Sequence, residues 1–256
     1  MILRYTDDLL KIPLPQGRFD PRNMDGFETF KEAVERRRVI LETLCDLHPF
    51  TLGGKLASCS MMKRCNSGAC PICCRRVRIR YCSMIAKHVG TDIQGWSSVS
   101  LVSEGDMYAV GKLGRCNPEL MKGRLAKQFA RSELKQVPVY GAVDFALDLT
   151  GKAQFSAHWY LLVRASPDEC REALERYYPQ TLSVARPMVA KGVRSEEAIH
   201  PATYLFKSTF KERRRSFDYR GNSSTQHAEL FGDPLVELLK VLDSWGFVRR
   251  IFQRNV

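Results

Sequence analysis

The sequence predicts an α+β fold in which helices pack on an antiparallel sheet, with a four-cysteine zinc knuckle inserted ahead of it. The order of elements is one reason, because strand and helix patterns follow one another from residue 96 with hairpin-type connections. A second is a pair of strands at 139–149 and 155–163, joined by a turn at 150–152. The third is a group of cysteines between residues 59 and 73 whose spacing suits a metal ion.

The length and composition fit one domain with an added module. A chain of 256 residues, 44% hydrophobic and 27% charged, has enough apolar side chains for a substantial core. We expect three segments along the chain. They are an N-terminal arm with an amphipathic helix (1–58), a zinc knuckle with a basic helix (59–90) and the α+β domain (91–256).

The charge points to a polyanionic partner. A formal net charge of +12 is expected to attract nucleic acid first and an anionic membrane second. No apolar run is long enough to span a bilayer and no signal peptide is recognisable, so a cytoplasmic location and no membrane partner are expected. In that reducing compartment the nine cysteines are not expected to form disulfides, and the several that lie between Cys59 and Cys82 suggest a metal site.

Periodicity and capping residues place the other elements. After an irregular arm over residues 1–22, apolar residues recur at helical spacing from 23 to 47. Asn117 before Pro118 opens a helix to residue 134, and Ser166 with Glu169 forms a capping box. Further elements are expected as a loop at 104–116, a polar segment to 232, strands at 96–103, 181–193 and 247–252, and helices from 200 to 215 and from 233.

The cysteine spacing predicts a structural zinc site. The expected ligands, in a C-x5-C-x4-C-P-x-C pattern, are Cys59, Cys65, Cys70 and Cys73. Four thiolates form a closed tetrahedral shell, which leaves no open position for catalysis. Cys74 and Cys82 are spare, and Cys74 is expected to point away from the ion. The alternative is a set of unrelated core cysteines.

Two basic runs are candidate phosphate contacts. The first follows the knuckle and contains Arg75, Arg76, Arg78 and Arg80; the second contains Lys211, Arg213, Arg214 and Arg215. Arginines at the exit of a zinc knuckle are well placed to meet phosphates. Each run also fits a solvated helix face. The positive charges of the second run would then interact favourably with the dipole at the C-terminus of a helix.

Polar residues on the hairpin and on the helix from residue 200 predict a catalytic site. Side chains two apart on a strand share a face, so His158 projects with Tyr160, and Asp144 with Asp148. A tyrosine and a lysine three residues apart, Tyr204 and Lys207, follow on the helix. A divalent metal held by His158 and a carboxylate beside a tyrosine nucleophile suits phosphodiester cleavage.

Each of these residues also has a structural interpretation. His158 is readable as a hydrogen-bonded core residue, Tyr204 as core packing and His200 as a helix cap. Asp148 adjoins the turn and is readable as a turn residue, so Asp144 is the favoured second ligand.

Taken in order, these motifs resemble the rolling-circle replication initiators of bacterial plasmids, which are HUH endonucleases. The shared features are a C…C…CPxC knuckle followed by arginines, a strand and a helix, an H-x-[HY] strand, and a helix with Y-x-x-K. They extend from Cys59 to Lys207. The resemblance implies an HUH or ferredoxin-like sheet and a 5′-phosphotyrosyl intermediate on single-stranded or hairpin DNA.

Residue by residue, the resemblance implies zinc on the four cysteines, Mg²⁺ or Mn²⁺ at His158, nucleophilic attack by Tyr204, and Lys207 as its partner. One position departs from the family, because Tyr160 stands where a second histidine is expected. A phenol ligates a hard divalent ion poorly until it is deprotonated. The ion is then held by His158 with Asp144, Asp148 or His200, or the site has lost its activity.

Two functional classes follow. The first is an enzyme that nicks and joins single-stranded DNA through Tyr204. The second is a DNA-binding regulator or accessory factor that keeps the fold and the zinc site without the chemistry. RNA binding is a weaker third, because the sequence has no aromatic ribonucleoprotein signature.

Overall fold

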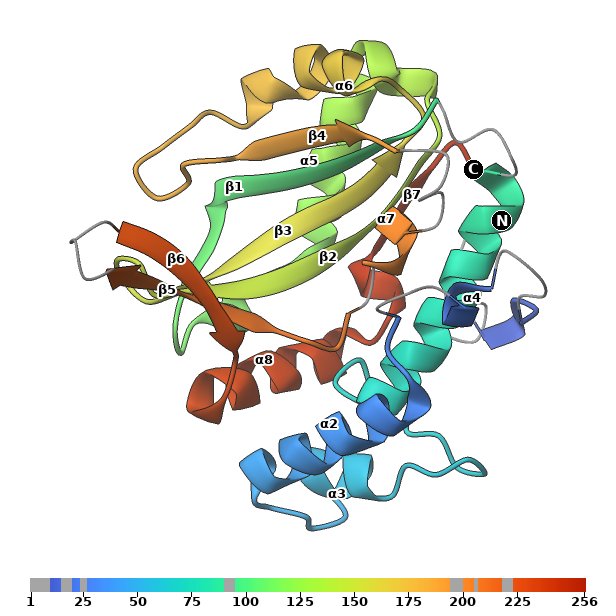
Figure 1. Ribbon diagram of the computed structural model, residues 1–256, viewed down its shortest axis with the longest axis vertical. Helices are drawn as coiled ribbons and strands as arrows, with labels where there is room; N and C mark the ends of the chain where they lie inside the picture. Colours follow the sequence, from blue (N-terminus) through green and yellow to red (C-terminus); the bar gives the residue numbers. More distant parts are fainter. Residues whose placement is uncertain are drawn as a thin grey trace.

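The computed structural model describes residues 10–14, 20–23, 27–89, 95–193, 200–204, 207–217 and 223–256. Much of the predicted N-terminal arm therefore lies outside it. A curled mixed sheet packed by helices forms the body of the protein, which confirms the α+β class (Figure 1). Buried residues from all three predicted segments join one apolar cluster, and the division into three stays a prediction.

The sheet has the strand order β4-β1-β3-β2-β5-β6, with β7 also paired to β2. The strands are β1 (Ser97–Ala109), β2 (Val139–Asp148), β3 (Gln154–Val163), β4 (Met188–Gly192), β5 (Lys211–Phe217), β6 (Ser223–Glu229) and β7 (Ile251–Arg254). The predicted hairpin is confirmed as β2 and β3, with Asp144 directly opposite His158.

One strand pairing corrects the prediction of an antiparallel sheet. Residues Lys211–Arg213 of β5 run parallel to Ala146–Asp148 of β2, whereas the other pairs are antiparallel. Between these two strands the chain forms β3, β4 and two helices, and a long connection of this kind allows a strand to return in the same direction. β7 occupies the other half of the same edge of β2.

The helices are α2 (Phe30–Leu44), α3 (Leu52–Ala57), α4 (Pro71–Val89), α5 (Pro118–Ala130), α6 (Pro167–Leu174), α7 (His200–Thr203) and α8 (Gly232–Trp245). Two predicted helix starts are confirmed. The Asn117 side chain accepts hydrogen bonds from the first turn of α5, and Ser166 and Glu169 form the capping box of α6. Within the described part of the chain, no helix has the length and apolar character that crossing a membrane requires.

The two faces of the central strands differ in chemistry. On one face, Phe145 of β2 packs against Trp245 of α8 with ring centroids 5.4 Å apart, and Trp159 of β3 packs against Phe252. The alternate residues Asp144 and His158 point to the other face. α8 thus packs on the face that carries Phe145, whereas the other face carries Asp144 and His158, and α4 packs on that face near Tyr140.

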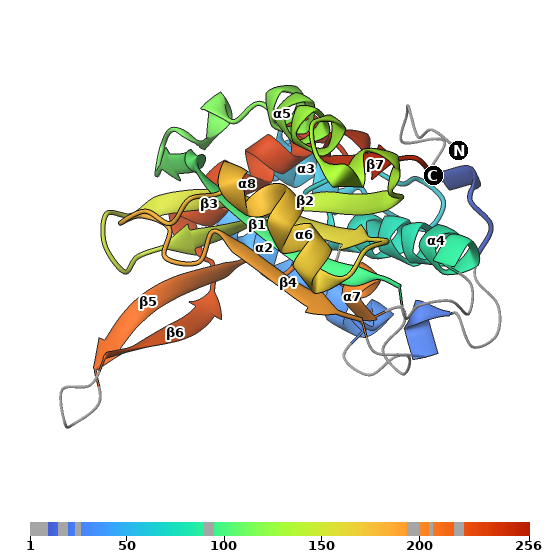
Figure 2. The ribbon, with the colours of Figure 1, turned by 90° about the horizontal axis from the view of Figure 1, so that it is seen from above.

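The region after residue 200 differs most from its prediction. α7 ends at Thr203, and the basic run from Lys211 forms a strand instead of the end of a helix. Pairing with β6 overrides the helical propensity of lysine, glutamate and arginine. β5 and β6 form a twisted ribbon that projects from the sheet (Figure 2). β1 also continues to Ala109, into the first part of the loop predicted at 104–116, after a register shift against β3.

Candidate metal centre and active-site cavity

The four predicted cysteines meet at one point. Their sulfur atoms all lie within 4.8 Å of one another, at 3.6 Å for Cys65–Cys73, 3.7 Å for Cys59–Cys73 and 3.8 Å for Cys59–Cys70. A tetrahedral zinc with Zn–S bonds of about 2.3 Å separates its sulfurs by about 3.8 Å. These thiols therefore have the spacing of a metal shell. No other group of three or more ligand-bearing side chains converges elsewhere in the residues described.

Local structure explains why these sulfurs converge. Cys70 accepts the first backbone hydrogen bond of α4, from Cys74, so it caps the helix, with Pro71 as the first helical residue and Cys73 as the third. Both sulfurs thus lie at the positive end of a 19-residue helix, which favours thiolates. Before them, Gly68 passes so close to α8 that a Cβ would lie 2.4 Å from the Leu242 carbonyl oxygen. The site is therefore built against the main core.

The thiols interact electrostatically as a group. A hydrogen bond from Cys70 lowers the pKa of Cys59 to about 6, while bonding to the neighbouring sulfurs raises the pKa of Cys70 itself. The neighbouring thiols thus shift one another's pKa values in opposite directions. A cation at the centre of the four sulfurs would favour the thiolate at all four positions.

The two spare cysteines are engaged elsewhere, as predicted. The Cys74 thiol donates to the Gly68 carbonyl at 3.2 Å, and the Cys82 thiol donates to the Ala202 carbonyl at 3.3 Å. Burial raises the pKa of each to about 12, so both stay protonated.

The second site lies on the polar face of β2 and β3. His158 Nε2 is 4.0 Å from Asp144 Oδ2, and the His158 and Tyr160 rings are in contact with centroids 5.0 Å apart. Burial lowers the pKa of His158, against the opposing effect of Asp144, and this keeps the imidazole neutral near pH 7. Asp148 instead accepts hydrogen bonds from Thr150 at 2.8 and 2.6 Å, which is the turn role considered above.

Tyr204 and Lys207 reach the same site from another part of the chain. Tyr204 follows the last residue of α7, with its ring centroid 6.3 Å from that of Tyr160. Lys207 Nζ lies over the Tyr204 ring, 3.1 Å from its centroid. Burial lowers the pKa of Lys207 to about 8, although Asp144 acts in the opposite direction. The predicted residues Asp144, His158, Tyr204 and Lys207 therefore lie close together. The helix expected to carry Tyr204 and Lys207 is α7, and it ends at Thr203, before both.

A cavity of about 340 Å³ opens on this polar face of β2 and β3. Its lining includes Asp144, His158, Tyr160 and Lys207, together with residues that the sequence did not indicate, namely Arg186, Thr209 and His227. Arg186 precedes β4, and His227 pairs with Arg213 across the ribbon. Since neither lies in a charged run, no local sequence signal marks them.

The donor set fits a divalent cation in part. Asp144 Oδ1 is buried and has no hydrogen-bond partner among the described residues, and His158 Nε2 faces the same carboxylate. Magnesium is commonly bound by one or two carboxylates and completed by water and phosphate oxygens. Burial raises the pKa of Tyr160 to about 12, so its phenol is not a ligand near neutral pH. The side chain of His200, the other ligand considered, lies outside the description.

The first basic run is used mainly inside the protein. Arg78 is only 5% exposed and donates to the Thr203 carbonyl, so it is not available to an external phosphate, contrary to the prediction. Arg75 donates to the Glu28 carbonyl at 2.7 Å, and Arg80 donates to that of Ile12. Arg76 is partly exposed. The run lies on α4, the helix that begins at the knuckle, and most side chains of α4 are buried.

The second basic run is exposed and has two faces. Lys211 and Arg213 line the cavity, and Arg213 lies 3.7 Å from Asp148. Arg214 points to the other face, where it pairs with the buried Glu212 and lies near Phe231. The side chain of Arg215 lies outside the described part. Strand alternation thus directs the charges of one run to opposite sides.

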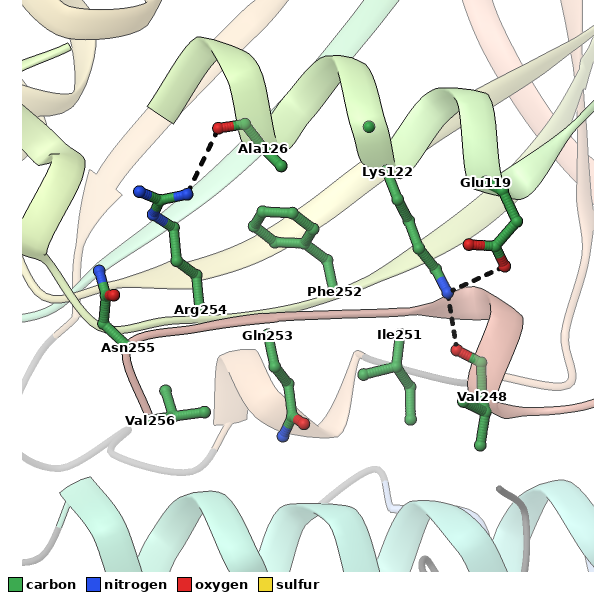
Figure 3. Close-up of a pocket in the computed structure, with 11 residues that line it drawn as sticks. Glu119, Lys122, Ala126, Val248, Ile251, Phe252, Gln253, Arg254, Asn255 and Val256 are labelled. Atoms are coloured by element: carbon green, nitrogen blue, oxygen red, sulfur yellow. Dashed lines mark hydrogen bonds and ion pairs between the residues drawn. The ribbon is translucent and has the colours of Figure 1, made fainter. Parts of the chain in front are cut away.

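A larger cavity, about 750 Å³, lies between α5 and β7 (Figure 3). Its cationic groups are already engaged, since Lys122 donates to the Val248 carbonyl at 3.1 Å and Arg254 donates to that of Ala126 at 3.4 Å. It lacks the convergence of histidine, carboxylate, tyrosine and lysine seen on the polar sheet face.

No protein-family model, curated protein or solved structure matches this chain.

Proposed function

We propose that this chain binds single-stranded or hairpin DNA and nicks and rejoins it through Tyr204, as the replication initiators that it resembles do. The proposal includes an HUH-type sheet and zinc on the four cysteines. The observation that carries it is a cavity with a cationic rim, lined by Asp144, His158 and Lys207. The Tyr204 ring lies beside this cavity, in contact with Tyr160 and Lys207. Such a group suits phosphoryl transfer to a tyrosine.

The rim supplies the contacts for a phosphodiester backbone. Arg186, Lys211 and Arg213 line the cavity, and Thr209 lines it with them. Arginine pairs with phosphate oxygens through a fork of N–H donors, and lysine acts as a point charge. The overall charge of +12 adds long-range attraction for the same partner.

In the proposed reaction, the Tyr204 hydroxyl oxygen attacks the scissile phosphorus. The bond from phosphorus to the 3′ oxygen breaks, that oxygen takes up a proton from water and leaves as the 3′-hydroxyl, and the 5′ phosphate stays on Tyr204. Burial lowers the pKa of Lys207 to about 8, so part of it is neutral near pH 8, and its Nζ lies over the Tyr204 ring. From there it would take the phenol proton through one bridging water. Attack by an incoming 3′-hydroxyl on the phosphotyrosine reverses these steps and joins the strands.

Asp144 and His158 are the residues that would hold a divalent cation. When bound, such an ion neutralises charge on the phosphate that is attacked. The two side chains are suited to this because Asp144 Oδ1 has no hydrogen-bond partner in the described part of the chain, and burial lowers the pKa of the His158 imidazole.

The test is adduct formation with a labelled single-stranded oligonucleotide and with Mn²⁺, Mg²⁺ or Co²⁺. We expect the wild type to give a denaturant-resistant protein–DNA band. Tyr160→His should give more of it, because imidazole ligates divalent ions near pH 7 and a phenol with a pKa near 12 does not.

The alternative is a DNA-binding protein without the chemistry, and the tyrosine at position 160 favours it, because it leaves His158 as the single histidine of the H-x-[HY] strand. If neither the wild type nor Tyr160→His forms an adduct with any of the three ions, while both bind DNA, this alternative replaces the enzyme.

Binding is expected to be strongly salt-dependent, with Arg213 contributing and Arg214 not. Each phosphate contact adds about 0.7 to the log–log slope of affinity against salt on single strands. Arg213→Gln should lower the slope by about that amount, because Arg213 lines the cavity. Arg214→Gln is the matched control, since its guanidinium pairs with Glu212 on the other face of the ribbon. Equal slopes for the two variants, or a flat salt dependence in the wild type, would contradict the proposed path of the strand.

A further inference from the structure

The segment that carries Tyr204 and Lys207 is attached on both sides to the N-terminal part of the chain. We propose that Arg78, Arg36 and Glu28 are positioning residues that fix this segment against the polar face of the sheet. The inference rests on the proposed function for its consequence in catalysis. The attachment itself is a property of the fold.

On the N-terminal side, α4 holds the end of α7. Arg78 donates from Nε to the Thr203 carbonyl, and the Cys82 thiol donates to the Ala202 carbonyl at 3.3 Å. The two donors are four residues apart and so lie on one face of α4. The last carbonyls of a helix have no partner inside it, and α4 supplies donors for two of them. Tyr204 is the next residue along the chain.

Arg78 is built into the structure for this contact. It is 5% exposed, and its guanidinium lies 4.3 Å from the centroid of the Phe27 ring. A buried arginine is costly unless it is well paired, and a ring face together with a carbonyl provides that pairing. Although Arg78 belongs to the basic run of α4, its side chain therefore contacts the interior of the protein and not solvent.

On the C-terminal side, a second group holds Ser208, which follows Lys207. The Ser208 hydroxyl lies 3.0 and 3.2 Å from the two carboxylate oxygens of Glu28 and accepts a hydrogen bond from Arg36 at 3.0 Å. Arg36 of α2 also forms an ion pair with Glu28, and Glu28 and Ser208 are both buried. Two residues from the N-terminal part of the chain, Glu28 and Arg36, therefore hold the backbone next to Lys207 through their contacts with Ser208.

Between these two attachments lie the two side chains that the proposed reaction uses. Their contacts with each other and with Tyr160 depend on where the backbone is held at Thr203 and at Ser208. A misplacement of about 1 Å costs on the order of 100-fold in rate when geometry is critical. Loss of either attachment is therefore expected to slow adduct formation without removing any residue that contacts DNA.

The experiment compares Arg78→Met and Ser208→Ala with two controls, Lys87→Met, which removes an exposed cation from the same helix, and Ser244→Ala on α8. The first readout is hydrogen exchange in peptides covering residues 200–210, with peptides from α5 and α6 as internal references. The second is the single-turnover rate of adduct formation, measured beside DNA affinity. Arg78→Lys tests whether a shorter cation restores part of the effect.

We expect faster exchange at 200–210 in both test variants, unchanged exchange in α5 and α6, and a rate lowered about tenfold or more with DNA affinity within about threefold. Both controls should match the wild type. Wild-type exchange at 200–210 in Ser208→Ala and in a folded Arg78→Met would overturn the inference, even if adducts form normally. Should Arg78→Met not fold, Ser208→Ala decides alone. If the wild type forms no adduct, the proposed function fails, and exchange still decides the attachment.

Discussion

Replacing Cys70 with serine is expected to release the bound metal and to unfold the knuckle. Cys70 is fully buried, caps α4 and lies 3.8 Å from the sulfur of Cys59, so the change removes a ligand and disturbs the start of the helix. Binding of structural zinc supplies about 10–16 kcal/mol to the folding of zinc-finger peptides. We therefore expect close to one zinc per wild-type chain by elemental analysis, almost none in Cys70→Ser, and a clearly lower melting temperature.

The matched control is Cys45→Ser, because Cys45 is exposed and does not belong to the cluster. It should keep the metal and the wild-type melting temperature. A wild-type protein purified without chelators that holds less than about half an equivalent of zinc would contradict the zinc assignment, given the closed shell that four sulfurs form. So would a Cys70→Ser protein that retains its metal.

Replacing Tyr204 with phenylalanine is expected to abolish the covalent adduct while leaving DNA binding within a few-fold. The change removes the attacking hydroxyl and keeps the ring, which packs on Tyr160 and beneath Lys207. The measurement is the denaturant-resistant band together with a binding isotherm on the same oligonucleotide.

Tyr160→Phe is the control for that result. Tyr160 lines the cavity and contacts the Tyr204 ring, but burial raises its pKa to about 12, and it is proposed to be a bystander. It should therefore keep the adduct. An adduct that persists in Tyr204→Phe, or one lost equally in both variants, would remove Tyr204 from the role of nucleophile.

The sequence by itself determined those features that depend on short spacing. The knuckle cysteines lie within 15 residues, from Cys59 to Cys73, and the start of α4 brings two of them together locally. The hairpin placed Asp144 beside His158, because the turn sets the register and alternation sets the face. The caps at Asn117 and Ser166 acted in the same way, since each bonds the backbone within three residues.

The tertiary structure decided which side of each basic run is available and where Tyr204 lies. Arg78 looked like its neighbours in the sequence, yet α7 and Phe27 bury it. The run from Lys211 has the composition of a helix, yet pairing with β2 and β6 made it a strand and placed Arg213 at the cavity. Burial and strand pairing depend on partners that are distant in the sequence, as for Arg78 and Thr203, which are 125 residues apart. The spacing of residues along the chain does not predict such partners, because only the packed fold brings them into contact.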